Sequence, residues 1–409
     1  MNRLLGIALG ILTAIGGFVD IGDLVTNAVV GSRFGLGLAW VVVVGVVGIC
    51  TYAHMAGKVA AVSGRATFEI IRERLGARTA ATNLAASFLI NLMTVTAEVG
   101  GIALVLQLAS GIHYLAWIPV AAFLVWLVIW RVRFKLMENV AGLTGLCLIV
   151  FAVALFLLGP NWLELAGAAL SPTVPEGEST WTYWYYAVAL FGAAMTPYEV
   201  FFFSSGAVEE NWSPKDVVQS RINVLAGFPL GGLLSLSIAA CAAVVLLPRQ
   251  IGVESLSQVV LPVAEAAGRI GLVVVLVGIL AATFGAALET TLSSGYTLAQ
   301  YFGWSWGKYR RPVDAARFHV AMVATLVVGL GILATGVDPV LVTELSVVFS
   351  AVALPLTYIP ILVVANDPEY MGTAVNGRAL NALGTFYLGV ILLAAFAAIP
   401  LLIVTGAGA

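Results

Sequence analysis

Apolar runs of about twenty residues or more recur along almost the whole sequence, and they constrain the fold more than any motif does. The runs near 36–62, 114–131 and 341–365 are each long enough to cross a bilayer as a helix. Because lipid offers the backbone no hydrogen-bond partner, only helices and closed barrels span a membrane. Charged residues make up 10% of the chain, against about 25% in a soluble domain. The sequence therefore predicts an all-α polytopic membrane protein.

We predict about eleven transmembrane helices in a single membrane domain that covers residues 1–409. The spans lie near 4–30, 36–62, 82–110, 114–131, 138–159, 182–208, 222–247, 268–302, 315–336, 341–365 and 379–405. The start of the chain resembles a signal peptide, but apolar sequence resumes after Asp23 without an obvious cleavage site, so we interpret it as the first span. The run 268–302 is too long for one upright crossing, and its last turns are expected to project into water.

The distribution of Lys and Arg predicts the orientation in the cell membrane. With the N-terminus in the cytoplasm, all of the 19 Lys and Arg residues except Arg33, Arg249 and Arg269 fall in predicted cytoplasmic segments, as the positive-inside rule requires. An odd number of spans then places the C-terminus outside. The predicted external loop 160–180 is acidic, which indicates a cation-attracting vestibule or simply a solvated loop. The net charge of −2 offers no basic surface for nucleic acid.

Two spans are interrupted near their centres by acidic, helix-unwinding sequence. The first break lies at 16–23 (GGFVDIGD) and the second at 192–199 (GAAMTPYE). A carboxylate in the middle of a span is costly, so it usually faces a cavity and marks a function. Paired broken helices at corresponding places in two halves of a chain indicate the binding site of a transporter.

Each break is followed by four continuous spans, which predicts a repeat. Because five spans is an odd number, the second set must run inverted through the bilayer. We expect inverted repeats at 4–159 (spans 1–5) and 182–365 (spans 6–10), with 379–405 as an extra span 11.

The candidate binding groups are the polar side chains and freed carbonyls of the two breaks. They are Asp20, Asp23, Thr196, Tyr198, Glu199 and the carbonyl groups of Val19 and Met195. Oxygen ligands suit hard cations such as Mg²⁺, Ca²⁺ or Mn²⁺. Alternatives stay open: either Asp could cap a helix instead, Glu199 could pair elsewhere, and Tyr198 could serve in packing.

Two further carboxylates, Glu98 in the third span and Glu289 in the eighth, are candidates for a proton or polar relay. For Glu289, a hydrogen bond between helices that holds the bundle together is the favoured interpretation.

At these residues the sequence resembles the NRAMP superfamily of divalent-metal transporters over nearly its whole length. Residues 17–23 and 31–35 resemble the family's first span, with its Asp-Pro-Gly-Asn signature, and 97–100 (AEVG) resemble its Asp-x-x-Glu segment. The best matches are 350–356 (SAVALPL) and 367–377 (DPEYMGTAVNG). The resemblance implies a leucine-transporter-type fold with one extra helix. It also implies import of Mn²⁺, Fe²⁺ or related ions, commonly with protons, while a related branch takes Mg²⁺.

Several positions depart from the family pattern. Asp-Pro-Gly-Asn becomes DIGD at 20–23, so an amide ligand turns into a carboxylate, and Met-Pro-His becomes TPY at 196–198. The third-span acid of the proton route falls at Val95, a later histidine at Phe203 and a glutamine of span ten at Val347. Without sulfur, selectivity for Mn²⁺ or Fe²⁺ over Mg²⁺ and Ca²⁺ should be poorer. Proton coupling by the usual route should be weak or absent.

We therefore predict a secondary-type transporter that moves a divalent cation of the Mg²⁺ or Mn²⁺ class by alternating access. The metal is its cargo and no cofactor is expected; protons and the lipid bilayer are further candidate partners. An enzyme is disfavoured because neither a nucleophile–base set nor a metal–histidine cluster is present. Two alternatives remain. A small organic cation could bind the same acidic site with help from the rings of Tyr198, Phe201 and Phe202, or the protein could be a non-transporting membrane sensor or scaffold.

Overall fold

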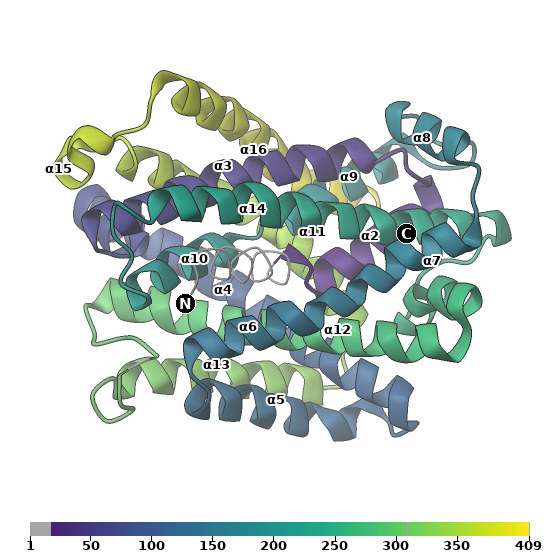
Figure 1. The fold of residues 1–409 in the computed structure, drawn as a ribbon, viewed down its shortest axis with the longest axis horizontal. Coiled ribbons are helices and arrows are strands. Elements are labelled where there is room, and N and C mark those ends of the chain that lie inside the picture. Colours follow the sequence, from purple (N-terminus) through teal and green to yellow (C-terminus); the bar gives the residue numbers. More distant parts are fainter. Residues whose placement is uncertain (1–17, 309, 409) are drawn as a thin grey trace.

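The computed structural model describes residues 18–308 and 310–408, and the regular structure of this part is entirely helical (Figure 1). Ten segments within it are long and apolar enough to cross a membrane. They correspond to the second to eleventh predicted spans, so the all-α polytopic prediction is confirmed. Most of the first predicted half-span, up to residue 17, lies outside the described residues.

The helices follow the predicted spans closely. Their bounds are α2 Ile21–Phe34, α3 Ala39–Ser63, α4 Thr67–Ser110, α5 Tyr114–Arg131, α6 Phe134–Gly145, α7 Val150–Leu158, α8 Trp162–Leu170, α9 Thr180–Ala194, α10 Pro197–Glu209, α11 Val217–Val245, α12 Leu256–Phe302, α13 Ala316–Ala334, α14 Pro339–Val364, α15 Pro368–Met371 and α16 Arg378–Val404. Short 3₁₀ turns follow α6, α11 and α15. The exposed helix α8 lies in the predicted external loop and was not anticipated.

Both predicted breaks are non-helical in the structure. The backbone is extended at Asp20, where α2 begins. In the sixth span, α9 ends at Ala194 and α10 begins at Pro197, so Met195 and Thr196 separate the two half-helices. Proline is well suited to this position, because the first turn of a helix has no use for its missing N–H.

Two helices are longer than a bilayer needs, and each is divided by a kink at a glycine with positive φ. Gly76 (φ 83°) divides α4, and Gly268 (φ 61°) divides α12. This left-handed conformation costs glycine little. The predicted start of the eighth span at 268 coincides with the second kink. The part of α12 that exceeds one membrane crossing thus includes the residues before Gly268 as well as the last turns before Phe302.

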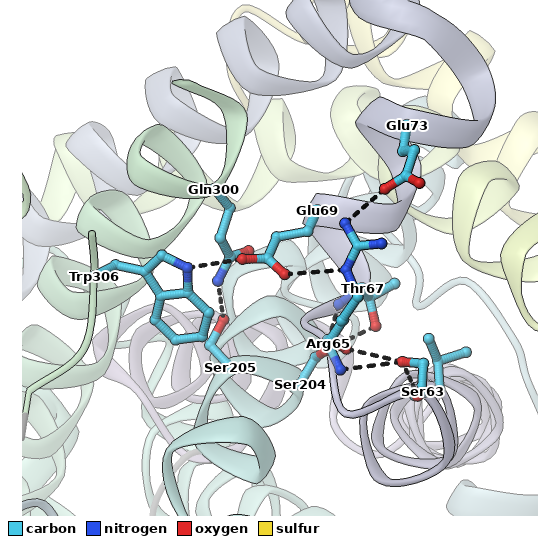
Figure 2. A network of polar contacts seen from close by, with 10 residues as sticks. Ser63, Arg65, Thr67, Glu69, Glu73, Ser204, Ser205, Gln300 and Trp306 are labelled. Carbon is cyan, nitrogen blue, oxygen red and sulfur yellow. Dashed lines mark hydrogen bonds and ion pairs between the residues drawn. The ribbon is translucent and has the colours of Figure 1, made fainter. Parts of the chain in front are cut away.

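Loops connect the helices at the two ends of the bundle (Figure 1), and the orientation in the membrane stays a prediction. At one end, α10 and the segment after α12 border an open cleft of about 1030 Å³ whose lining includes Glu69, Glu209 and Trp306; Figure 2 shows the Trp306 indole bonded to Glu69. At the other end, Arg33 forms a two-pronged ion pair with Glu178 of the predicted external loop. Arg33 also donates to the carbonyl group of residue 408.

Candidate ion-binding site

The two breaks face one small cavity inside the bundle. Its lining comes from four elements: Asp20, Ile21 and Gly22 at the first break, Thr196 at the second, Thr94, Ala97 and Glu98 of α4, and Thr343, Ser346, Val347 and Ser350 of α14. The volume open to the centre of a water-sized sphere is about 10 Å³, which is about what one water molecule requires. The polar side chains of this lining end in carboxyl or hydroxyl groups.

Asp20 caps a helix, as one of the sequence alternatives had it, and it also lines the cavity. Its Oδ1 accepts a hydrogen bond of 2.8 Å from the backbone N–H of Asp23 and thereby caps α2. Its Oδ2 accepts a bond of 3.1 Å from the Tyr198 hydroxyl, which joins the two breaks directly. The positive end of a helix stabilises a negative group at this position. Both oxygens of the Asp20 carboxyl group are therefore held in place at the edge of the cavity.

Glu98 of α4 contacts the first break directly. Its Oε1 accepts a bond of 3.1 Å from the backbone N–H of Ile21, in the first turn of α2. Its Oε2 is buried and has no hydrogen-bond partner within the described part of the chain. A buried oxygen of this kind is costly unless a cation or a proton satisfies it. Glu98 thus supplies a second acid to the cavity wall.

Three hydroxyl groups of α14 complete the wall, and sequence reasoning missed them. Thr343, Ser346 and Ser350 follow the i, i+3, i+7 spacing of one helix face and all line the cavity. Ser346 also exchanges a hydrogen bond of 3.1 Å with Thr94 of α4. A narrow polar stripe in an otherwise apolar span was the available signal.

Asp23 points away from the cavity, towards α11. Its carboxylate accepts hydrogen bonds from the Ser235 hydroxyl and, at 2.9 Å, from the Asn27 amide. It is buried and absent from the cavity lining. The structure therefore places the two aspartates of the DIGD sequence differently: Asp20 faces the other break, and Asp23 ties α2 to α11.

The remaining groups of the second break surround the cavity without lining it. The Tyr198 hydroxyl is engaged by Asp20. Glu199 is buried on α10, and its Oε2 has no hydrogen-bond partner within the described part of the chain. Glu289 of α12 is buried as well, and the hydrogen bond between helices favoured for it from the sequence stays a prediction.

The backbone and side chain of Met195 are both occupied by packing. Its carbonyl oxygen accepts a bond of 3.1 Å from Tyr358 of α14. Its thioether lies against α3, where a Cβ placed on Gly48 would come within 2.6 Å of the sulfur. Val19 is fully buried at the first break and is not part of the cavity lining.

Two glycines allow α14 to reach both breaks. A Cβ added to Gly192 would lie 2.3 Å from the carbonyl oxygen of Val347, and one added to Gly22 would lie 2.7 Å from the Val347 side chain. Both distances are too short for real atoms. Val347 therefore fills the space between the half-helices, and α14 forms the common wall of the site.

The helical bundle described here, with two broken spans around an oxygen-lined cavity, has the architecture of the leucine-transporter fold, and solved structures agree. A manganese transporter from Eremococcus coleocola, in complex with an aromatic bis-isothiourea compound, matches with a TM-score of 0.69 and 19% identity, covering 95% of this chain and 85% of that one. Mhp1, a nucleobase-cation-symport-1 family transporter, matches with a TM-score of 0.63 and 17% identity, covering 97% and 90% of the two chains.

The family follows from the sequence comparison. The family model described as natural resistance-associated macrophage protein-like matches residues 10–400, and the chain belongs to this Nramp family. The divalent metal cation transporter MntH of Acidiphilium cryptum is 24% identical over 379 residues, 90% of this chain and 84% of that protein. The MntH of Aeromonas hydrophila is 26% identical over 390 residues, 92% and 91% of the two proteins. These relatives are transporters and not enzymes, and a metal is their substrate rather than a cofactor.

Proposed function

We propose that this protein moves a hard divalent cation, of the Mg²⁺ or Mn²⁺ class, across the cell membrane into the cytoplasm. The observation that carries the proposal is the chemistry of the cavity wall. Its polar side chains offer carboxylate and hydroxyl oxygens, and none of its lining residues carries sulfur or imidazole. Such ligands suit Mg²⁺, Ca²⁺ and Mn²⁺, whereas thioether and thiolate select softer ions.

In this proposal Asp20 and Thr196 are ligands from the two breaks, and Glu98 supplies a second negative charge. The two carboxylates balance the charge of a divalent ion, and the α14 hydroxyls or retained water complete its shell. Asp23, Tyr198 and Glu199 act from behind the cavity wall. The carbonyl groups of Val19 and Met195 remain candidate ligands for a state in which the half-helices have moved.

Alternating access follows from the arrangement of the breaks. The cavity takes one water-sized sphere, so an ion that keeps several waters must enter and leave through states that are more open. The non-helical residues at 19–20 and 195–196 are suitable hinges for the half-helices. We propose that 4–159 and 182–365 are the inverted repeats that move against each other, with the N-terminus in the cytoplasm and the C-terminus outside.

Proton coupling is proposed to be weak or absent by the route usual in the family. Val95, which stands where the third-span acid is expected, is fully buried and can carry no proton. The small cavity also argues against the organic-cation alternative, because an amine with carbon substituents exceeds one water in size.

The test is ion uptake into liposomes containing the purified protein, with Mn²⁺ and Mg²⁺ outside and dyes for metal and pH inside. Asp20→Asn should reduce uptake at least tenfold, because it removes a charged ligand. Glu164→Gln on the exposed helix α8 is the matched control and should leave uptake unchanged. Full uptake by Asp20→Asn would refute the site, and strong acidification of the lumen during Mn²⁺ uptake would refute the weak coupling.

A further inference from the structure

Exposed arginines gather where α5 ends and α13 begins. Arg131 is the last residue of α5 and Arg133 lies two positions further on, whereas Arg311 precedes α13 and Arg317 lies in its first turn. All of these side chains are exposed, and within the described part of the chain no ion pair includes any of them. The exposed Asp314 offsets at most one of the charges. The result is a positively charged patch with no neutralising partner of its own size.

A partly buried lysine holds the two halves of this patch together. The Nζ atom of Lys308 donates hydrogen bonds to the carbonyl groups of Val128 and Ile129, at 3.4 and 2.9 Å, and to that of Val132. These carbonyls form the negative end of α5, where a cation is stabilising. The loop after α12, in which Arg311 follows Lys308 by three positions, is therefore fixed against the end of α5. Figure 1 shows α5 and α13 side by side at one edge of the bundle.

Tryptophan rings accompany the arginines. The Arg131 guanidinium lies 4.1 Å from the centroid of the Trp130 ring, and that of Arg317 lies 5.6 Å from the Trp304 ring. Trp126 stacks on Trp130 with their centroids 5.1 Å apart. An aromatic face attracts a guanidinium group without removing its charge, and tryptophan is enriched at the membrane–water interface. The rings therefore hold the arginines in place and leave their charge available to a ligand.

The exposed apolar faces of the two helices indicate how deep the patch lies in the membrane. Phe123 and Leu124 are exposed at the middle of α5, and Val323 and Val327 at the middle of α13, so both helices present these side chains to lipid tails. At 1.5 Å per residue, Arg131 and Arg317 each lie about 12 Å along the helix from its midpoint. Half of the hydrocarbon core of a bilayer is about 15 Å thick. The guanidinium groups thus reach the phosphate layer of one leaflet, since long basic side chains extend towards the interface.

We propose that Arg131, Arg133, Arg311 and Arg317 bind the headgroup of an anionic phospholipid, in the cytoplasmic leaflet if the proposed orientation holds. The planar guanidinium fork matches the oxygens of a phosphate group. The acyl chains would lie on the exposed apolar faces of α5 and α13, one helix from each proposed repeat. A free phosphate shares the headgroup chemistry, but it would leave these adjoining apolar faces unused. The inference is independent of which ion the protein moves.

Lipid titration of the purified full-length protein tests the site. Phosphatidylglycerol and phosphatidylcholine with the same acyl chains are added to the protein in detergent, and bound lipid is counted by native mass spectrometry. The parent should bind phosphatidylglycerol more tightly, and the double variant Arg131→Gln/Arg317→Gln should weaken that binding about tenfold or more, because each arginine near an anionic lipid adds to the attraction. The matched control, Arg78→Gln/Arg221→Gln, removes two exposed arginines from α4 and α11 and should bind as the parent does.

The remaining outcomes separate a lipid site from its alternatives. Equal binding of the two lipids by the parent would overturn the proposal, and so would an equal loss in both double variants, which would mean attraction to overall charge. Inorganic phosphate that displaces phosphatidylglycerol at equal concentration would show a free-anion site instead of a lipid site. Arg131→Lys/Arg317→Lys keeps the charge and lacks the fork, so it should bind more weakly than the parent even if the glutamine variant does not fold. A parent that moves no metal ion would refute the proposed function and leave these lipid comparisons intact.

Discussion

The substitution Gly192→Ala should damage the site although it adds only one methyl group. The new Cβ would lie 2.3 Å from the carbonyl oxygen of Val347, which is 1.1 Å short of the 3.4 Å at which ordinary contact begins, and 3.2 Å from both the N and Cβ atoms of Ala351. Val347 O and Ala351 N are backbone atoms, so no side-chain rotation relieves the clash. Helix α14 must move away from α9 by about 1 Å.

The cost of this movement can be bounded. Overpacking by one methyl group destabilises a protein by about 1–3 kcal/mol. Misplacement of a functional group by about 1 Å can cost on the order of 100-fold in rate, and here Ser346 and Ser350 move with Val347 while the cavity itself is only about 10 Å³. We expect Mn²⁺ uptake to fall between tenfold and a hundredfold, with a lower thermal midpoint in detergent.

The matched control is Gly389→Ala, in the middle of α16. A Cβ there meets nothing within 4 Å, so this variant should gain slightly from the better helix propensity of alanine and transport normally. Liposome uptake and thermal denaturation of both variants, side by side, provide the comparison. If Gly192→Ala behaves like Gly389→Ala in both assays, the close approach of α14 to the second break is wrong.

Three further predictions concern selectivity, pH and the outer end. Thr196→Met brings a soft thioether to the cavity, so competition by Cd²⁺ in the uptake assay should strengthen; unchanged competition would argue against Thr196 as a ligand. Burial lowers the pKa of Lys308, in the loop after α12, to about 8 from a usual value of 10.5. The unfolded chain therefore holds more protons between these values, and stability should rise with pH across that window; the rise should be smaller in Lys308→Met, as thermal midpoints would reveal. We expect the ion pair between Arg33 and Glu178 to limit access from the outer end. Arg33→Gln removes it, so a cysteine introduced by Ser32→Cys should react faster with an impermeant thiol reagent added outside, and equal reaction rates would contradict this expectation.

The fold was predictable from the sequence because the bilayer imposes so few solutions. The length of each apolar run set the spans, and the two acidic interruptions located the breaks to within a residue or two. Even the kink at Gly268 coincided with a predicted span boundary. What the runs did not reveal was α8, which crosses no membrane and carries no length constraint.

The site was predictable in part, and the limit was rotation about the helix axis. An acid in a broken segment signals a function, but the helical phase after a break is not fixed by the acids themselves. Asp20 and Asp23 lie three residues apart, yet only Asp20 faces the cavity. The phase of Asp23 is set by its hydrogen bond to Ser235 on α11, and that contact joins positions 212 residues apart in the sequence.

The hydroxyl groups of α14 show why sequence motifs did not identify the whole lining of the cavity: these groups reach it only through helix packing. Ser346 and Ser350 reach the cavity because Gly22 and Gly192 let their helix approach both breaks at once. Each of the four residues is unremarkable alone, since glycine and serine are common wherever membrane helices pack closely. Their value as a set depends on three helices meeting at Val347. Acidic residues in a broken span can therefore be found from the sequence, whereas the uncharged hydroxyl groups of such a site are found only from the packing of the helices.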